Sequence, residues 1–134
     1  MALVLTDYTK LYYQEMLKIP VPPKVTGKFV QIRHESTEYL IFSPEELTKY
    51  HANIVERFCF DKGLEGGYDA KGTRFEIADR AWSVSGGGKY EMNTGRKFIR
   101  LYDNSMAYGK FGKQILADKL RSFAELAGFV VMIE

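Results

Sequence analysis

The sequence predicts an α/β fold: a mixed central β-sheet sandwiched by two main helices, with an additional N-terminal helix. Segments with alternating apolar residues, typical of strands, are interspersed with two segments in which apolar residues recur every three or four positions, typical of helices. A turn signal at 93–95 separates two strand-like segments, which predicts a hairpin and therefore a mixed sheet. The chain has 134 residues, 46% of them hydrophobic, which is enough for one domain with a substantial core.

The first 23 residues are predicted to form a helical extension, followed by a single domain over 24–134. Asp7 is a candidate N-cap for the extension's helix, and the prolines at 20, 22 and 23 would end it. The alternating segments 28–33 and 38–42 then predict two strands of the domain.

A helix start is predicted directly after these strands. Ser43 has the residue type of an N-cap, Pro44 suits the first helical position, and Glu46 would complete a capping box. The helix is expected to run to about Asp61 and to stop near Gly63.

The second half of the chain predicts strands around a glycine run. A weak strand is expected at 74–77, and a strand at 81–85 leads into three glycines at 86–88, which permit close backbone approach. The returning strand of the hairpin is expected at 97–103.

A second main helix and a last strand are predicted at the C-terminal end. The helix would follow Gly112, and Gly128 fits its C-cap. Its predicted apolar stripe comprises Leu116, Leu120, Phe123 and Ala127. The continuously apolar segment 129–133 is typical of an interior strand.

Composition excludes several classes of function. The formal net charge is only +2, which does not by itself indicate nucleic acid or an anionic membrane as a partner, although 89–121 carries a local basic excess. Cys59 is the only cysteine, so an internal disulfide is impossible and a small core residue is expected there. No signal peptide or membrane-spanning run is visible, so we expect a cytoplasmic protein, monomeric, without nucleic-acid or membrane partners.

His51 is the residue that poses the functional question. The helical spacing places it on or beside the apolar stripe, in the second or third turn of the helix predicted from Ser43. One reading is a core histidine that is hydrogen-bonded to a backbone carbonyl. The other is a neutral general base or nucleophile, a state that the helix dipole would modestly favour.

Two loops have the composition of anion sites. The segment 105–109 (SMAYG) lies between a predicted strand end and a predicted helix start, where backbone amides can converge on an anion. The segment 85–89 (SGGGK) would place Lys89 beside an anion, but it lacks the Walker A and dinucleotide-binding patterns. Each loop has an ordinary structural reading as well. With two histidines and no metal-binding spacing, no metal or other cofactor is expected.

Three motifs together resemble the protein phosphohistidine phosphatase (Janus/ocnus) family. They are 50–54 (YHANI), 86–89 (GGGK) and 105–109 (SMAYG), and they occur in the order of the family's Y-H-A-D-I, G-G-G-R and Y-S-M-A-Y-G patterns. The resemblance spans about residues 27–133. It implies a metal-independent phosphatase that acts on phosphohistidine-containing proteins.

The resemblance also implies the roles of individual residues. His51 would be catalytic, and the phosphate ion would be bound by Ser105, Met106, Ala107, Lys28 and Lys89. Lys89 stands where the family often has arginine, and lysine cannot bind phosphate in a bidentate manner. Asn53 replaces the usual aspartate, Ser43 falls where the mammalian form carries an arginine, and the loop 63–81 has no clear counterpart.

Several alternatives stay open at this point. His51 would either activate a water molecule or accept the phosphoryl group itself. The enzyme would act on phosphohistidine or, as a broader phosphoramidase, on phospholysine and small phosphoramidates. A non-catalytic phosphoprotein-binding module would retain the same anion site without turnover. A nucleic-acid binder is the weakest alternative, because no recognition motif is present.

Overall fold

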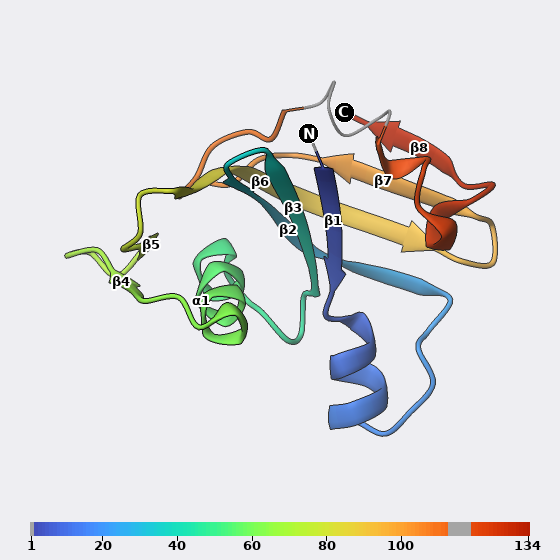
Figure 1. Ribbon diagram of the computed structural model, residues 1–134. Helices are drawn as coiled ribbons and strands as arrows, with labels where there is room; N and C mark the ends of the chain where they lie inside the picture. The colour runs from blue at the N-terminus through green and yellow to red at the C-terminus, as the bar shows by residue number, and fades with distance from the viewer. Residues whose placement is uncertain (1, 113–118) are drawn as a thin grey trace.

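The main structural feature is a curled six-stranded mixed sheet with the strand order β1-β3-β2-β6-β7-β8 (Figure 1). The computed structural model describes residues 2–112 and 119–134. In chain order the strands of this sheet are β1 (Ala2–Asp7), β2 (Lys24–His34), β3 (Thr37–Pro44), β6 (Trp82–Asn93), β7 (Phe98–Tyr102) and β8 (Val130–Ile133). A separate two-stranded sheet contains β4 (Gly66–Tyr68) and β5 (Phe75–Ile77). The predicted mixed α/β class is confirmed.

The sheet is antiparallel at its centre and parallel at both edges. Strand β2 pairs antiparallel with β3 and β6, and β6 pairs antiparallel with β7, while β1 and β8 lie parallel to β3 and β7. Alternation along β2 directs Val30 and Ile32 to one face and Phe29 to the other, and all three side chains are completely buried. Both faces of the sheet therefore need a cover.

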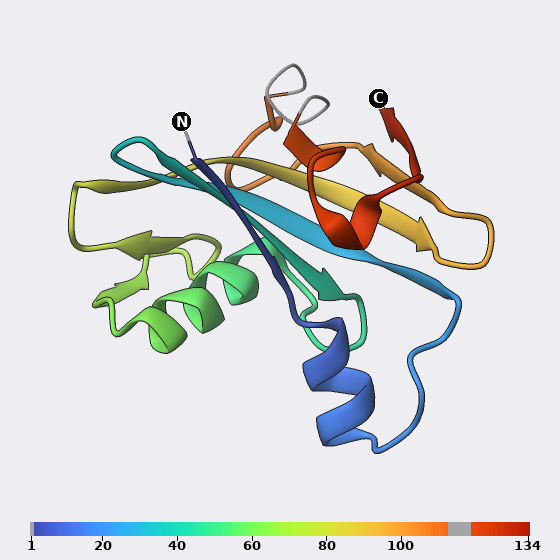
Figure 2. The ribbon, with the colours of Figure 1, turned by 45° about the vertical axis from the view of Figure 1, so that its right-hand side comes forward.

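Helix α1 (His51–Lys62) covers one face together with β4 and β5 (Figure 2). Its buried side chains include Ile54, Val55 and Phe58, which pack in one cluster with Val30 and Ile32. The helix ends where Gly63 adopts a left-handed conformation with φ of 69°, as the sequence predicted. At its other end, α1 begins beside β6, since the His51 side chain hydrogen-bonds to the backbone of Gly88.

The C-terminal segment packs on the opposite face, and only part of the second main helix predicted there falls on described residues. Residues 113–118 of that prediction lie outside the described residues. Beyond them, Lys119 and Leu120 are helical, and turns and a short 3-10 helix, η2 (Ala124–Leu126), follow, so the helix does not continue to the predicted C-cap at Gly128. Leu120 and Leu126 still enter the core, where they join the cluster of Phe29. Of the predicted apolar stripe, Leu120 is buried, Phe123 is half-buried and Ala127 is exposed, whereas Leu126, which lies outside that stripe, is buried. The spacing fails beyond Leu120 because the chain there follows turns and a 3-10 helix and not one continuous α-helix.

The N-terminal segment contains a strand that the predicted helical extension omitted. Strand β1 is part of the main sheet, and the chain turns after Asp7 into a short π-helix, η1 (Leu11–Met16). Asp7 Oδ1 accepts the backbone N–H of Thr9 at 2.9 Å, but Asp7 ends β1 and the N-cap of η1 is Lys10, so the predicted cap of this helix is wrong. Helical spacing did not reveal this strand, because the strand depends on pairing with the distant β3.

The predicted helix start at Ser43 is wrong. Strand β3 continues through Pro44, and α1 begins only at His51. Ser43 pairs with Lys28 of β2, and its hydroxyl hydrogen-bonds to that of Thr48 instead of capping a helix. Pairing in the sheet outweighs the local capping signal. His51 consequently lies in the first helical turn and not in the second or third.

Two further strands differ from their predictions. Strand β6 does not stop at the glycine run but continues through it, with a bulge at Ser85, since Gln31 is opposite Gly86 and Ile32 is opposite Val84. Strand β8 is an edge strand and not an interior one, and Val130 is 61% exposed. The predicted hairpin between β6 and β7 is confirmed.

Candidate functional site

A cavity of about 930 Å³ lies between the N-terminus of α1, strands β2 and β6, the β4–β5 hairpin and the loop that follows β7. It contains five of the six predicted site residues. The lining side chains and backbone come from Lys28, Tyr50, His51, Ala52, Asn53, Tyr68, Gly72, Thr73, Lys89, Asp103, Asn104, Met106 and Ala107.

His51 is positioned by a hydrogen bond to strand β6. Its Nε2 lies 2.8 Å from the carbonyl oxygen of Gly88, and the side chain is nearly buried, with 9% exposed. A carbonyl only accepts, so Nε2 carries the proton of the neutral ring and Nδ1 holds the lone pair. The ring therefore makes the hydrogen bond to a backbone carbonyl that was expected of a structural histidine, and it also lines a cavity.

The environment keeps the imidazole neutral. Burial lowers the pKa of His51 below its usual 6.5, and the positive charges of Lys28 and Lys89 lower it further. The Gly88 carbonyl and Asp103 act in the opposite direction but do not outweigh burial. A neutral ring with one available nitrogen is suited to act as a base or nucleophile.

Gly87 provides the surface against which the ring lies. A Cβ at this position would be 3.0 Å from His51 Cδ2, 2.7 Å from the carbonyl oxygen of Phe29 and 3.3 Å from Ser105 Cβ. Only glycine allows the imidazole to approach the strand this closely. The glycine at position 87 thus allows the His51 ring to pack directly against the backbone of β6.

Lys28 and Lys89 are opposite one another on β2 and β6. The Lys28 ammonium group donates to the carbonyl oxygen of Lys49 and lies 6.0 Å from the ring centre of Tyr50. The Lys89 ammonium group forms an ion pair with Asp103 at 3.3 Å. Two like charges on facing positions are unfavourable without a counter-charge. An anion in the cavity would be attracted by both lysines.

The loop 105–109 contributes in a different way from the prediction. Ser105 is buried and does not line the cavity: its N–H donates to the Gly109 carbonyl and its Oγ accepts the N–H of Tyr108. The amides of Met106 and Ala107 donate to no acceptor among the described residues. Ser105 is therefore a residue that shapes the loop, whereas the next two amides remain available to an anion.

No helix begins directly after this loop in the described residues, because Lys110 pairs with Gly87 of β6. The predicted helix dipole comes instead from α1. The N–H groups of His51 and Ala52, in its first turn, lack partners within the helix, and the dipole there favours an anion. Asn53 completes this helix start by accepting the Tyr50 N–H at 3.1 Å through its side chain.

Sequence reasoning missed Tyr68 and Asp103. Tyr68 belongs to the glycine-rich loop 63–81, where an aromatic residue among polar ones was the available signal. Asp103 lies directly after β7, a place where functional side chains are common. Its pKa is lowered, chiefly by the hydrogen bond from Lys89, so it stays ionised beside the cavity.

Within 2–112 and 119–134, no three His, Cys, Asp or Glu side chains are grouped so that they could hold a metal ion. None of the helices in the same ranges has the length and apolar character that a bilayer span requires. Cys59 is buried, and burial raises its pKa to about 11, so the predicted role as a core residue is confirmed.

The site thus combines a neutral imidazole with two lysines, a helix N-terminus and two available loop amides around one cavity. This combination can bind an anion and transfer a proton or an acyl or phosphoryl group beside it. No curated protein matched the chain. The model of the Janus/Ocnus family (Ocnus) matches residues 16–126, which include every residue of the cavity. The chain belongs to the Janus/Ocnus family.

Proposed function

We propose that this protein is a protein-histidine phosphatase that hydrolyses the phosphorus–nitrogen bond of phosphohistidine without a metal cofactor. The observation that carries the proposal is the neutral His51 ring, which lines a cavity together with Lys28 and Lys89. A phosphoryl group bears negative charge, and phosphoryl transfer depends mainly on positioning and on neutralisation of that charge. Phosphate ion would be the second product bound there.

The phosphoryl oxygens would be bound by the two lysines and the amides of Met106 and Ala107. The phosphorus atom would then lie within reach of His51 Nδ1, the ring nitrogen that Gly88 does not engage. The N-terminus of α1 adds a favourable field for the same charge. These groups are fixed before substrate arrives, which is the arrangement that electrostatic catalysis requires.

Two routes are compatible with this arrangement. In the first, Nδ1 takes a proton from a water molecule while the water oxygen bonds to phosphorus and the phosphorus–nitrogen bond breaks. In the second, Nδ1 itself bonds to phosphorus, the substrate imidazole leaves, and water then hydrolyses the phosphorylated His51. In both routes the released imidazole nitrogen takes up a proton from solvent.

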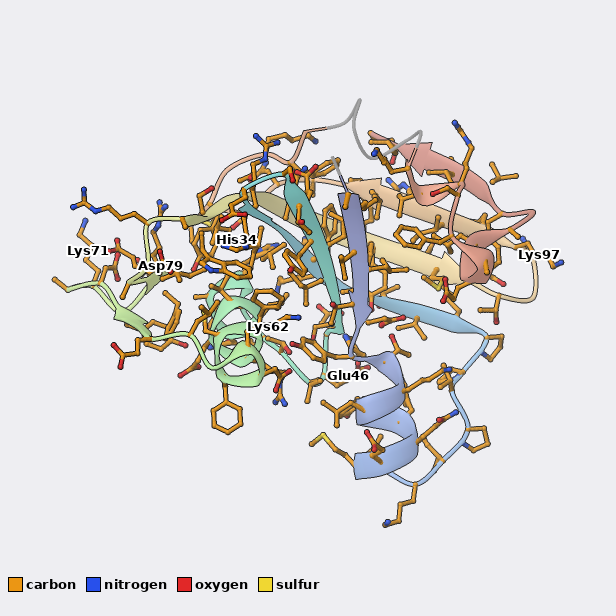
Figure 3. All side chains as sticks on the ribbon, viewed as in Figure 1. His34, Glu46, Lys62, Lys71, Asp79 and Lys97 are labelled. Atoms are coloured by element: carbon orange, nitrogen blue, oxygen red, sulfur yellow. The ribbon has the colours of Figure 1, made fainter. Side chains whose placement is uncertain are left out.

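The decisive experiment measures phosphate release from a phosphohistidine peptide by the wild type and by His51→Ala. We expect kcat/KM to fall by about 10²–10⁴-fold, the range typical of a lost general base. The matched control is His34→Ala, since His34 lies at the end of β2, stacked on Trp82 with ring centres 4.0 Å apart and outside the cavity (Figure 3). Full activity of a folded His51→Ala protein would contradict the proposal.

A second measurement separates the two routes. Wild-type enzyme is mixed with labelled substrate and quenched at alkaline pH, because phosphohistidine is labile in acid. Label retained on His51 supports the phosphoenzyme route. Absence of label on the protein during turnover supports direct attack by water, because solvent oxygen enters the released phosphate in both routes. Turnover that persists after treatment with a chelator would support metal independence.

A further inference from the structure

The β4–β5 hairpin forms one wall of the cavity, and the proposed function assigns no role to this wall. Tyr68, Gly72 and Thr73 of this hairpin line the same cavity as Lys28 and Lys89. The hairpin lies beside α1, with Lys71 at its outer end, away from the main sheet (Figures 1 and 3). The cavity is therefore bounded by an element that lies outside the three sequence motifs.

Hydrogen bonds join the hairpin to two parts of the candidate anion site, namely helix α1 and the loop 105–109. On the helix side, the Tyr68 hydroxyl accepts from Asn53 Nδ2 at 3.0 Å and donates to Glu56 Oε1 at 2.8 Å. On the loop side, the buried Tyr108 hydroxyl accepts the N–H of Phe75 at 2.9 Å and donates to its carbonyl oxygen at 2.7 Å. These bonds fix the hairpin relative to α1 and to the loop 105–109.

The Tyr68 ring is held in one orientation while part of its surface remains available. Its edge-to-face contact with Phe75 has ring centres 5.2 Å apart and an interplanar angle of 84°, and its hydroxyl is bonded at the far end. The residue is nevertheless 41% exposed. A ring that is fixed at both ends loses little conformational freedom when a ligand contacts it, so such contacts contribute more of their energy to affinity.

The cavity is too large for a phosphoryl group alone. Its volume of about 930 Å³ is near the upper end of the roughly 300–1,000 Å³ typical of sites for drug-sized ligands. Lys28 and Lys89 attract the charged phosphoryl group, and the remaining space is adjacent to the hairpin. That space would receive the group that bears the phosphoryl, where it meets the Tyr68 ring.

We propose that Tyr68 is a specificity-determining residue whose ring contacts the aromatic ring that bears the phosphoryl group. The site then prefers phosphohistidine to aliphatic N-phosphoryl groups such as phospholysine. This inference rests on the proposed function for the identity of the substrate, but not for the binding preference itself. Aromatic pairs contribute enough beyond their buried area to shift binding about two- to tenfold.

The test compares the binding of three probes by calorimetry. The first is a peptide with a phosphonate on a triazole ring, a stable analogue of phosphohistidine; the second is the same peptide with an alkylphosphonate; the third is inorganic phosphate. The wild type should bind the ring probe about two- to tenfold more tightly than the alkyl probe. Tyr68→Ala should remove this preference and leave the affinity for inorganic phosphate unchanged.

Matched variants separate recognition from positioning. Tyr68→Phe keeps the ring and should retain most of the preference, while Tyr68→Leu loses the ring but keeps an apolar contact with Phe75 and should behave as Tyr68→Ala does. Phe60→Ala removes an aromatic side chain that is 85% exposed on α1 and outside this cavity, and should change nothing. Thermal unfolding of each variant identifies any loss of fold.

The outcomes distinguish the two proposals. Equal binding of the ring and alkyl probes by the wild type, no binding of the ring probe, or an equal loss for the ring probe and inorganic phosphate in Tyr68→Ala would each overturn the role of Tyr68. A preference for the ring probe that depends on Tyr68, in a wild type that releases no phosphate from phosphohistidine, would overturn the proposed hydrolase and leave the binding role intact.

Discussion

His51 Nε2 lies 2.8 Å from the carbonyl oxygen of Gly88, which is 37 positions away in the chain. This hydrogen bond joins the first turn of α1 to the middle of β6 and sets which ring nitrogen carries the proton. It depends on Gly87, against which the ring packs with Cδ2 only 3.0 Å from the place of a Cβ. The glycine run and the histidine are thus one structural unit.

Gly87→Ala should therefore damage the site even though it adds a single methyl group. The new Cβ would meet the backbone oxygen of Phe29 and the His51 ring, so the ring must move or the strands must separate. We expect a loss of about 1–3 kcal/mol in the free energy of unfolding, the usual cost of overpacking. Phosphatase activity should fall more steeply than stability, because the ring loses its position.

Denaturant unfolding and phosphate release measure the two effects of Gly87→Ala. Gly67→Ala is the control, since a Cβ at that position of β4 would meet nothing within 4 Å. If Gly87→Ala changes neither the free energy of unfolding nor the phosphatase activity, the imidazole does not need to pack this closely against β6.

Lys89 and Asp103 should affect anion binding in opposite directions. The ion pair between them, at 3.3 Å, occupies the ammonium group that an anion would otherwise engage. Lys89→Gln should weaken phosphate binding, and Asp103→Asn should strengthen it by removing both the competitor and a repulsive charge. Lys89→Arg should bind phosphate at least as well as the wild type, because the guanidinium group offers two donors.

Titration of each variant with inorganic phosphate at several salt concentrations tests these expectations. The differences between variants should shrink as salt rises, since the charges are partly exposed and are screened. Weaker binding by Asp103→Asn would mean that the carboxylate orients Lys89 and does not compete for it.

The lowered pKa of His51 has a consequence for stability. Between the lowered folded pKa and the unfolded value of about 6.5, the unfolded chain binds more protons than the folded one. Stability is therefore intact above about pH 6.5 and declines as the pH falls toward the folded pKa. The acid limb of kcat/KM for the free enzyme should likewise have its midpoint below 6.5.

Urea unfolding between pH 7.5 and pH 5 measures the stability effect of this titration. His51→Gln serves as the control, because it cannot titrate while the carboxylates, which affect both proteins, remain. The wild type should lose more stability than His51→Gln over this interval. An equal loss would indicate that the pKa of His51 is the same in the folded and unfolded chains.

Tyr108→Phe should loosen the hairpin from the anion loop. The substitution leaves the N–H and the carbonyl of Phe75 without their buried partner, which costs about 1–3 kcal/mol for an unsatisfied group. Hydrogen exchange should rise across β5, and KM for a peptide substrate should increase. Tyr102→Phe is the control, because the Tyr102 hydroxyl hydrogen-bonds to no described residue. Unchanged hydrogen exchange across β5 in Tyr108→Phe, measured at the same temperature as the wild type, would contradict the proposed link between the hairpin and the loop 105–109.

The success of the sequence predictions depended on how local each signal was. The strand at 28–33 and the stop at Gly63 followed from alternation and from glycine's access to positive φ, and both are present. The helix start at Ser43 failed because pairing of Ser43 with Lys28 in the sheet is a non-local interaction. In the site, the motifs contain His51 and Lys89 and the family resemblance implied Lys28, whereas Tyr68 and its hydrogen bonds required the folded hairpin.

The sequence alone determined the mixed α/β class and the residue types that can handle an anion, because periodicity, turn residues and motifs are properties of short segments. The tertiary structure decided that His51 begins α1, that its Nε2 engages Gly88, and that Tyr68 closes the cavity. Each of these depends on contacts between segments far apart in the chain. Their geometry follows from the packing of α1 and the hairpin on the sheet.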